Sequence, residues 1–209
     1  MNNYSKRFVT VDAAIFSVIN NKLKVFLQIR EKEPFKGYYE LLGGFVKVNE
    51  TCEKALERKL KQVSNINIEF FQFKVFSEPS RDPENEVISI GYVSLINERL
   101  ANTLGKFYDL NDLPKTSFDH KSIIMKARQY LKNNIESIIT EKALPEVFSL
   151  NCLQKLYEIV TEEKLDNRNF RKKLILKGIV KPTSIKQSSV GHRPAKLYKL
   201  SIKNWRIIF

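Results

Sequence analysis

Hydrophobic residues in the first hundred positions follow a pattern that predicts β-strands. Residues 8–19 (FVTVDAAIFSVI) and 22–30 (KLKVFLQIR) are rich in β-branched and aromatic residues, and an Asn-Asn turn separates them. Two such runs around a short turn are typical of a β-hairpin. Residues 68–79 and 86–96 have the same character and predict further strands.

Two other segments of this half have apolar residues at helical spacing. Thr51 is placed to cap the first helix. The apolar face of that helix consists of Ala55, Leu56, Leu60 and Val63. Residues 120–138 predict a second amphipathic helix. Strands and helices mixed in this order predict an α+β fold whose first domain ends near Ile139.

The pattern changes in the last third of the chain. Residues 150–163 and 167–177 predict two helices, and Asp166 or Asn167 is placed to cap the second. Two strands of a closing hairpin are predicted at 178–183 and 194–202. This order is that of a winged helix-turn-helix, in which the second helix enters the major groove of DNA. We place the domains at 1–142 and 143–209.

The net charge of +13 is concentrated in this second domain. Residues 164–209 hold 13 Lys and Arg against one acidic residue, whereas residues 1–163 hold 23 Lys and Arg against 22 acidic residues. A small basic domain with interleaved aromatic residues is typical of a nucleic-acid-binding protein. Double-stranded DNA is therefore the expected partner.

Composition excludes several other classes of protein. The 43% of hydrophobic residues can form a core, which argues against disorder. We expect neither a membrane span nor a signal peptide, because no apolar run is long enough, and we expect a cytoplasmic protein. Cys52 and Cys152 are isolated from each other and from histidines, which argues against a disulfide framework or a zinc site.

Residues 44–66 resemble the Nudix box, whose pattern is G-x5-E-x7-R-E-U-x-E-E-x-G-U with U an aliphatic residue. The residues that match at the right spacing are Gly44, Glu50, Arg58, Leu60 and Ile66. The resemblance extends over residues of about 8 to 140. It implies that the first domain is a Nudix-like α/β/α sandwich.

The carboxylates of the Nudix box are missing. Nudix enzymes hold a divalent metal with three glutamates on one helix face, and these positions are Lys59, Gln62 and Val63 here. We therefore expect no metal site, no other cofactor, no catalytic residues and no enzyme activity. Glu50 and Arg58 are expected to be structural residues that hold the loop to the helix.

A degenerate Nudix domain followed by a basic winged helix resembles the Nudix-related transcriptional regulators, the NrtR family. The supporting segments are 148–158, 165–174 and 191–198, together with 80–83 and 118–120 in the first domain. The resemblance implies a homodimeric repressor that reads a palindromic operator and whose Nudix domain senses an effector. We favour the branch common among Bacteroidetes, which responds to a pentose such as L-arabinose, because the metal cluster is lost and Glu86 stands where relatives often have arginine.

Two alternatives remain open at this stage. The first is a regulator of NAD metabolism with the same architecture that senses ADP-ribose. The second, from a different class, is a residual Nudix hydrolase with a nucleic-acid-binding appendage.

Candidate DNA-binding residues lie on the second helix and in the wing of the winged helix. Arginine and asparagine can read base edges, and lysine more often contacts phosphate. Phe170 and Leu174 are expected on the buried side of the helix. The candidates are Arg168, Asn169, Arg171, Lys172, Lys173, Lys186, Ser188, His192, Arg193 and Lys196.

Candidate effector-binding residues come from two loops of the first domain. Arginines and carboxylates can hydrogen-bond sugar hydroxyls, and adjacent glycines let a backbone approach a ligand closely. The candidates are Arg30, Tyr39, Glu40, Gly43, Gly44, Arg81, Asp82 and Glu86. An ion pair between Arg81 and Asp82 within a turn is the structural alternative, and His120 is expected to cap a helix.

Overall fold

A computed structural model describes residues 6–186 and 195–201 of the chain. Its first domain is built on a six-stranded sheet in the order β6-β7-β1-β2-β8, with β5 also paired to β1. Strands β1 and β7 run parallel, and the other pairs are antiparallel. The strands are β1 (Phe8–Ile19), β2 (Lys22–Phe26), β5 (Leu42–Phe45), β6 (Phe71–Phe76), β7 (Val87–Ile96) and β8 (Phe107–Asp109).

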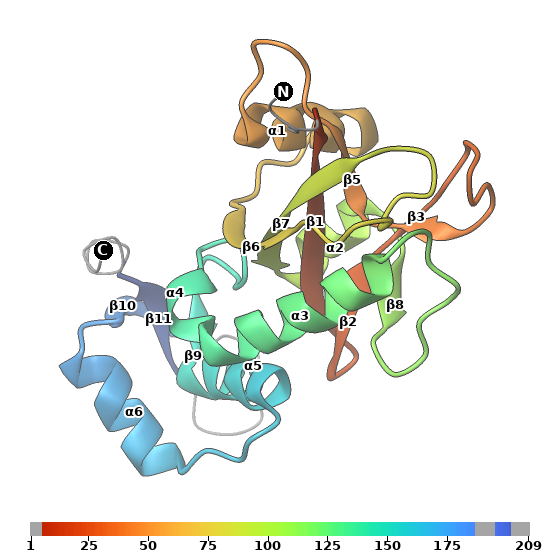
Figure 1. Cartoon of the computed structure of the whole chain (residues 1–209). Coiled ribbons are helices and arrows are strands. Elements are labelled where there is room, and N and C mark those ends of the chain that lie inside the picture. Colours follow the sequence, from red (N-terminus) through yellow and green to blue (C-terminus); the bar gives the residue numbers. More distant parts are fainter. Residues whose placement is uncertain (1–5, 187–194, 202–209) are drawn as a thin grey trace.

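Helices cover both faces of this sheet, as expected for an α/β/α sandwich (Figure 1). Successive side chains of β1 point to opposite faces. Val11 and Ile15 pack in one apolar cluster with helices α1 (Cys52–Val63) and α2 (Glu98–Leu104). Phe16 packs on the other face with α3 (His120–Asn133).

Helix α1 begins where the sequence predicts. The Thr51 hydroxyl accepts a hydrogen bond from the Lys54 backbone N–H at 3.3 Å, which satisfies one of the free amides of the first turn. Leu56 and Leu60 are buried, whereas Val63 is 39% exposed and does not belong to the buried face.

Several elements differ from the expected pattern. The run 22–30 divides into β2 and a short strand β3 (Gln28–Ile29), which pairs with β4 (Tyr39–Glu40) in a separate hairpin. The helix expected at 120–138 divides at Asn134 into α3 and the single turn α4 (Ile135–Ile138). Helix α2 and strand β8 were not expected.

The second domain is a winged helix. Helices α5 (Leu150–Thr161) and α6 (Asn167–Leu176) are followed by strands β10 (Val180–Lys186) and β11 (Lys196–Leu200). Strand β9 (Phe148–Ser149) completes a three-stranded sheet in the order β10-β11-β9. Of the two caps considered for the second helix, the structure selects Asp166, which accepts from the Asn169 N–H at 2.8 Å.

One cluster of buried side chains continues from the first domain into the second. It runs from Phe16 in the sheet through Leu131 of α3 and Ile138 of α4 to Leu153 of α5 and Phe170 of α6. Figure 1 shows α3, α4 and α5 stacked between the sheet and α6. The two domains therefore share a core.

The connection between α4 and β9 is held against the first domain. The side-chain amide of Asn97 donates to the backbone oxygens of Lys142 and Leu144, at 3.0 and 3.2 Å. The same residue caps α2 by accepting from the Leu100 N–H at 3.0 Å. Our boundary between residues 142 and 143 falls within this connection and stays a prediction. Among the described residues, no helix is long and apolar enough to cross a bilayer.

Candidate functional site

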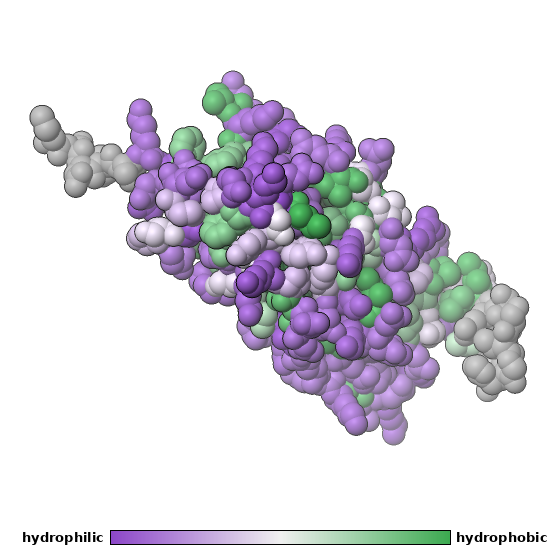
Figure 2. Space-filling view, turned by 90° about the vertical axis from the view of Figure 1, so that its right-hand side faces the viewer, coloured by the Kyte–Doolittle hydropathy of each residue, from purple (hydrophilic) through white to green (hydrophobic). Residues whose placement is uncertain are grey.

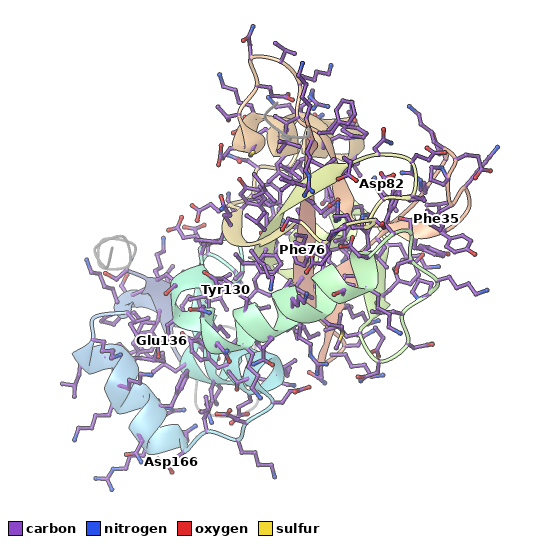
Figure 3. The ribbon with its side chains drawn as sticks, viewed as in Figure 1. Phe35, Phe76, Asp82, Tyr130, Glu136 and Asp166 are labelled. Carbon is purple, nitrogen blue, oxygen red and sulfur yellow. The ribbon has the colours of Figure 1, made fainter. Side chains whose placement is uncertain are left out.

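A cavity of about 710 Å³ opens beside β1 and β5, where α1, the loop 81–87 and the first turn of α3 meet. The predicted effector residues that line it are Arg30, Glu40, Gly43, Gly44, Arg81 and Asp82. Figure 3 shows Asp82 and Phe35 of the β3–β4 loop on the same side of the molecule. Figure 2 views the molecule from this side, where hydrophilic side chains cover most of the surface and apolar ones form small separate groups.

Two predicted effector residues lie outside this cavity. The Tyr39 ring packs against Tyr108, with 4.9 Å between ring centroids. Adjacent residues of a strand point to opposite faces, so Glu40 reaches the cavity and Tyr39 does not. Glu86 lies at the surface, in an ion pair of 3.3 Å with Arg7. The sequence pattern pointed to two loops that line this cavity but could not assign the face of each side chain.

A second cavity, of about 840 Å³, lies between the domains and is lined by residues such as Ile96, Leu144 and Leu156. It contains none of the predicted effector residues. We place the candidate ligand site in the first cavity, because the Nudix-box residues Lys59 and Gln62 line it.

The floor of the ligand cavity contains a buried polar network centred on Asp12, which the sequence reasoning missed. Asp12 is 5% exposed and accepts a short hydrogen bond from the Ser89 hydroxyl. The Arg81 guanidinium lies 2.6 Å from Asp119 and 3.6 Å from Asp12. The His120 Nε2 lies 3.4 Å from Asp12. Burial of these charges is possible because they compensate one another.

His120 has a different role from the helix cap that we expected. Its Nδ1 accepts a hydrogen bond from the Leu41 N–H at 3.1 Å. A nitrogen that accepts cannot carry the hydrogen, so in the neutral ring the hydrogen is on Nε2, which faces Asp12. Asp119 occupies the N-cap position of α3 without a side-chain cap bond, since its carboxylate binds Arg81.

Arg81 and Asp82 do not form the ion pair that we considered. The Asp82 carboxylate instead accepts from the backbone N–H groups of Glu84 and Asn85, at 2.9 and 3.1 Å. Such a bond to the backbone two residues ahead is typical of aspartate in turns. Arg81 anchors the loop to the sheet, and Asp82 shapes the loop.

Glu50 and Arg58 have the structural role predicted for them. Arg58 Nε and Nη2 lie 2.6 and 2.8 Å from the two oxygens of Glu50, and Nη2 also donates to the Phe45 carbonyl at 3.0 Å. The Arg58 hydrogen bonds, with the Lys47 backbone N–H, lower the pKa of Glu50 from its usual 4.5 to about 2. This pair holds the Nudix-box loop against α1.

The Nudix-box positions that normally hold metal do not fit a divalent cation. Lys59, Gln62 and Val63 line the cavity and present one ammonium, one amide and one isopropyl group. A hard cation requires several oxygen ligands, with carboxylates prominent among them. Within residues 6–186 and 195–201, no group of three or more His, Cys, Asp or Glu side chains could hold a metal ion.

The space that a side chain would take at Gly43 and Gly44 is filled by other parts of the protein and is not open to a ligand. A Cβ at Gly43 would lie 2.2 Å from the Val11 carbonyl oxygen, since β5 pairs closely with β1 here. A Cβ at Gly44 would lie 2.5 Å from Cε and 3.1 Å from Nζ of Lys59. Gly44 also has a φ of +145°, which favours glycine. These glycines therefore admit a neighbouring strand and the Lys59 side chain.

Arg30 joins the wall of the cavity to the aromatic loop beside it. Its guanidinium lies 2.9 Å from Glu40 and 4.7 Å from the centroid of the Phe118 ring. It also donates to the Pro34 carbonyl at 2.6 Å. The Phe35 ring packs against Phe118 from outside the cavity, with 5.0 Å between the ring centroids.

Helix α6 presents a basic face to solvent. Phe170 and Leu174 are buried, at 7% and 1% exposure, as predicted. The five candidate residues on this helix are exposed: Arg168, Asn169, Arg171, Lys172 and Lys173. Figure 3 shows Asp166 at the outer end of the helix, where its first turn is accessible.

The five candidate side chains of α6 differ in whether other parts of the protein hold them. Lys173 forms an ion pair with Glu136 of α4, and Lys177 lies 3.4 Å from the same carboxylate. Lys173, one of the candidate DNA-binding residues, thus faces the first domain. Arg171 donates to Asn151 of α5 at 2.8 Å. Arg168 has no hydrogen bond or ion pair in the part of the chain that the structure describes.

The wing is described only in part. Lys186 ends β10 and pairs in register with Lys196, which is exposed at the start of β11. The candidates Ser188, His192 and Arg193 lie outside the described residues.

The fold and the cavity define a class: a Nudix domain without metal ligands, joined to a DNA-binding winged helix. Residues 9–126 match the NUDIX domain family, and residues 141–200 match the NrtR DNA-binding winged helix domain. The chain belongs to the Nudix family, and its second domain resembles the DNA-binding winged helix of NrtR.

Two known regulators are similar to this chain, and one of them is represented by two solved structures. An ADPR-responsive transcriptional repressor of Acinetobacter baylyi is 29% identical over 99% of this chain and 87% of its own. NrtR of Shewanella oneidensis in complex with a 27mer DNA has a TM-score of 0.83 and 26% identity, with 94% of this chain and 95% of that chain covered. Its Nudix domain in complex with ADP ribose has a TM-score of 0.54 and 28% identity over 61% of this chain and 90% of that chain.

An enzyme is also among the relatives. An ADP-ribose pyrophosphatase of Methanocaldococcus jannaschii is 38% identical over 53% of this chain and 69% of its own. The pentose-responsive branch that we favoured finds no support in these relatives, and the ADP-ribose alternative fits them better.

Proposed function

We propose that this protein is a transcriptional repressor that releases its operator when ADP-ribose binds the Nudix domain. One observation carries the proposal: the domain has an open cavity of about 710 Å³ although the metal-binding positions hold Lys59, Gln62 and Val63. A domain that keeps the pocket and lacks the metal ligands is suited to binding without hydrolysis. The A. baylyi repressor and the ADP-ribose complex of the S. oneidensis Nudix domain support this choice of effector.

The dimensions of the cavity favour a nucleotide over a pentose. Its volume lies in the range of sites that enclose a drug-sized ligand, whereas a pentose would fill a small part of it. Phe118 and the guanidinium of Arg30 give the wall an aromatic and a cationic surface, against which a nucleobase can stack.

Helix α3 connects the cavity with the DNA-binding domain. Its N-terminus belongs to the Asp12 network through Asp119. Further along, Arg128 forms an ion pair with Glu162, in the turn that precedes α6. Glu136 of α4 then contacts Lys173 of α6. A ligand that displaces the first turn of α3 therefore acts on the position of the recognition helix, which gives two sites a shared structural element.

On the DNA side, α6 is the proposed recognition helix and the strands β10 and β11 form the wing. We further propose a homodimer that reads a palindromic operator, since two winged helices related by a twofold axis match two half-sites. The S. oneidensis complex with a 27mer DNA supports DNA as the partner.

The direct test measures DNA binding by the full chain with and without effector. A duplex selected from a random pool by the chain itself is labelled, and its fluorescence anisotropy is followed during titration. ADP-ribose should weaken binding several-fold, and L-arabinose should leave it unchanged. Release by L-arabinose and not by ADP-ribose would restore the pentose reading and overturn the proposed effector.

The similarity to an ADP-ribose pyrophosphatase requires a separate test of hydrolysis. The full chain is incubated with ADP-ribose and magnesium, and release of AMP is followed by chromatography. We expect no turnover, because the carboxylates that would hold the metal are replaced. Turnover at about 1 s⁻¹ or faster, which is ordinary for enzymes, would show a catalytic Nudix domain.

A further inference from the structure

Lys59 occupies a metal-ligand position of the Nudix box and places a half-buried ammonium group at the cavity. Its side chain is half-buried on α1, and it lines the cavity. Its Cε and Nζ lie over Gly44, whose missing Cβ leaves room for them. Among the described residues, none forms a hydrogen bond or ion pair with its ammonium group.

The surroundings of Lys59 compensate its charge only in part. Burial lowers the pKa of Lys59, and the cations Arg58 and Lys32 act in the same direction, while Glu40 and Asp12 raise it more weakly than burial lowers it. A buried charge without a partner is unfavourable unless a partner arrives.

The inner carboxylates of the cavity are already engaged and cannot supply that partner. Glu40 binds Arg30 at 2.9 Å. Asp12 is held by Ser89, Arg81 and His120. The charge that the interior of the cavity leaves available is therefore the Lys59 ammonium.

The carboxylates at the rim do not change this balance. Glu31, Glu33 and Glu84 are exposed to solvent, where water and salt screen their charge. The half-buried Asp82 carboxylate is held by the backbone N–H groups of Glu84 and Asn85. Gln62, three residues after Lys59 on α1, adds a neutral amide to the same cavity. The site is thus arranged for an anionic group at the former metal position.

We propose that the Lys59 ammonium replaces the divalent cation of Nudix enzymes and holds the diphosphate of the effector without metal. The inference rests on the proposed function, because it assigns the effector to sugars linked to a nucleoside diphosphate. A lysine supplies a fixed point charge for phosphate oxygens. It provides no metal-bound water and no second cation for a leaving group, so the diphosphate is bound and remains intact.

The test compares Lys59→Met with the wild-type full chain by isothermal titration calorimetry in EDTA. Methionine keeps an unbranched apolar stem over Gly44 and removes the charge, so the fold should be retained, as a thermal melt verifies. We expect ADP-ribose to bind the wild type without metal, and binding to the variant to weaken about tenfold to hundredfold, since a charge-assisted hydrogen bond is lost. Lys61→Met, on the exposed side of the same helix, is the matched control and should bind as the wild type does.

Inorganic pyrophosphate, as a second probe, separates this inference from the proposed function. Pyrophosphate binding that depends on Lys59, in a chain that does not bind ADP-ribose, would uphold the anion site and refute the effector. Equal binding of ADP-ribose by wild type and Lys59→Met, or binding that requires added magnesium, would refute the role of Lys59 while leaving the effector intact. Failure of both probes to bind the wild type would refute both.

Discussion

Arg81 is the residue that attaches the loop 80–83 to the sheet and to α3. Its side chain is 6% exposed and compensates the charge of Asp12 and Asp119. Arg81 stabilises the fold because it supplies a cation beside the buried Asp12 carboxylate. A buried carboxylate without its cation is far more unfavourable than a buried pair.

Arg81→Met should therefore destabilise the protein by about 3–5 kcal/mol, measured as the free energy of unfolding in urea. Arg7→Met is the matched control, since the Arg7–Glu86 pair is exposed at the surface. Pairs of that kind contribute about 0–1 kcal/mol. Equal losses for the two variants would mean that the Asp12 network does not depend on Arg81.

Glu50 gives a prediction for acid stability. Its pKa is lowered to about 2 in the fold by Arg58, from a usual 4.5. A carboxyl whose pKa falls on folding adds stability above its unfolded pKa, and this contribution is lost as the pH falls from about 4.5 toward 2. Glu50→Gln should lower stability at pH 7, and its difference from wild type should shrink below pH 4.5.

Urea unfolding of both proteins between pH 7 and about pH 3 measures this effect. Glu57→Gln, at an exposed position on the same helix, should show no such change in the difference. A constant difference for Glu50→Gln across the acid range would refute the role of the Glu50–Arg58 pair.

At the residue scale, sequence reasoning found the loops of the site better than the side chains within it. Arg81 and Glu40 follow from their motifs. Asp12 and His120 could not be found in this way, because Asp12 lies in an otherwise apolar strand and its partners come from distant segments of the chain. The one available signal was the presence of an aspartate, Asp12, inside the apolar run 8–19. A buried aspartate requires partners that compensate its charge.

Among the elements, α6 carries the DNA-binding prediction. Arg168 is exposed and makes no contact within the described ranges that restrains it, whereas Lys173 is held by Glu136. The two residues have the same charge and lie one and a half turns apart on one helix, so they form a natural pair for comparison.

Arg168→Ala should reduce operator affinity by about 1–3 kcal/mol, as expected for loss of an arginine contact to a base edge. Lys173→Ala should reduce it much less. Anisotropy titrations at one fixed salt concentration measure both, because DNA affinity depends steeply on salt. The reverse order would mean that α6 enters DNA with its other face.

Helices α3 and α4 carry the prediction about coupling. Glu136→Gln removes the carboxylate that holds Lys173 and Lys177. Operator binding should persist, while the weakening caused by ADP-ribose should shrink from its full coupling, typically about 5-fold to 150-fold, toward no effect.

Glu146→Gln is the control for this variant, since its exposed pair with Lys199 joins the segment before β9 to β11 and does not involve α4 or α6. It should retain the full response to ADP-ribose. An undiminished response in Glu136→Gln would exclude the α4–α6 contact as the route of coupling.

The elements themselves were predicted unevenly. Long periodic segments such as α1 and β7 agree with the sequence pattern. Helix α2 was missed because it has only two buried positions, Ala101 and Leu104, too few for a recognisable period. The break between α3 and α4 at Asn134 was missed because both sides continue to bury isoleucine and leucine.

On the scale of the whole molecule, the two domains are joined by more than a linker. The apolar cluster includes residues from β1 to β10, and Asn97 binds the connection at two carbonyls. The distribution of charge along the chain distinguished a near-neutral first domain from a basic second domain. It contained no information about how closely the two domains pack.

A shared core predicts one cooperative unfolding transition. Differential scanning calorimetry of the full chain should give a single peak whose calorimetric and van't Hoff enthalpies agree. Asn97→Ala, which removes both side-chain bonds to the connection and keeps the backbone bond to Lys142, should lower the midpoint and keep the single peak. Two resolved peaks in the wild type would mean that the domains unfold independently.

The continuous core also restricts how such a regulator can acquire new targets. Leu153 and Phe170 of the winged helix belong to the same buried cluster as residues of the Nudix domain. A different winged helix in its place would leave unmatched apolar surfaces on both sides of the junction. Substitutions on the exposed outer face of α6 are therefore expected to change DNA preference with the fold retained. Exchange of the winged helix alone should destabilise both domains, because each contributes side chains to the same core.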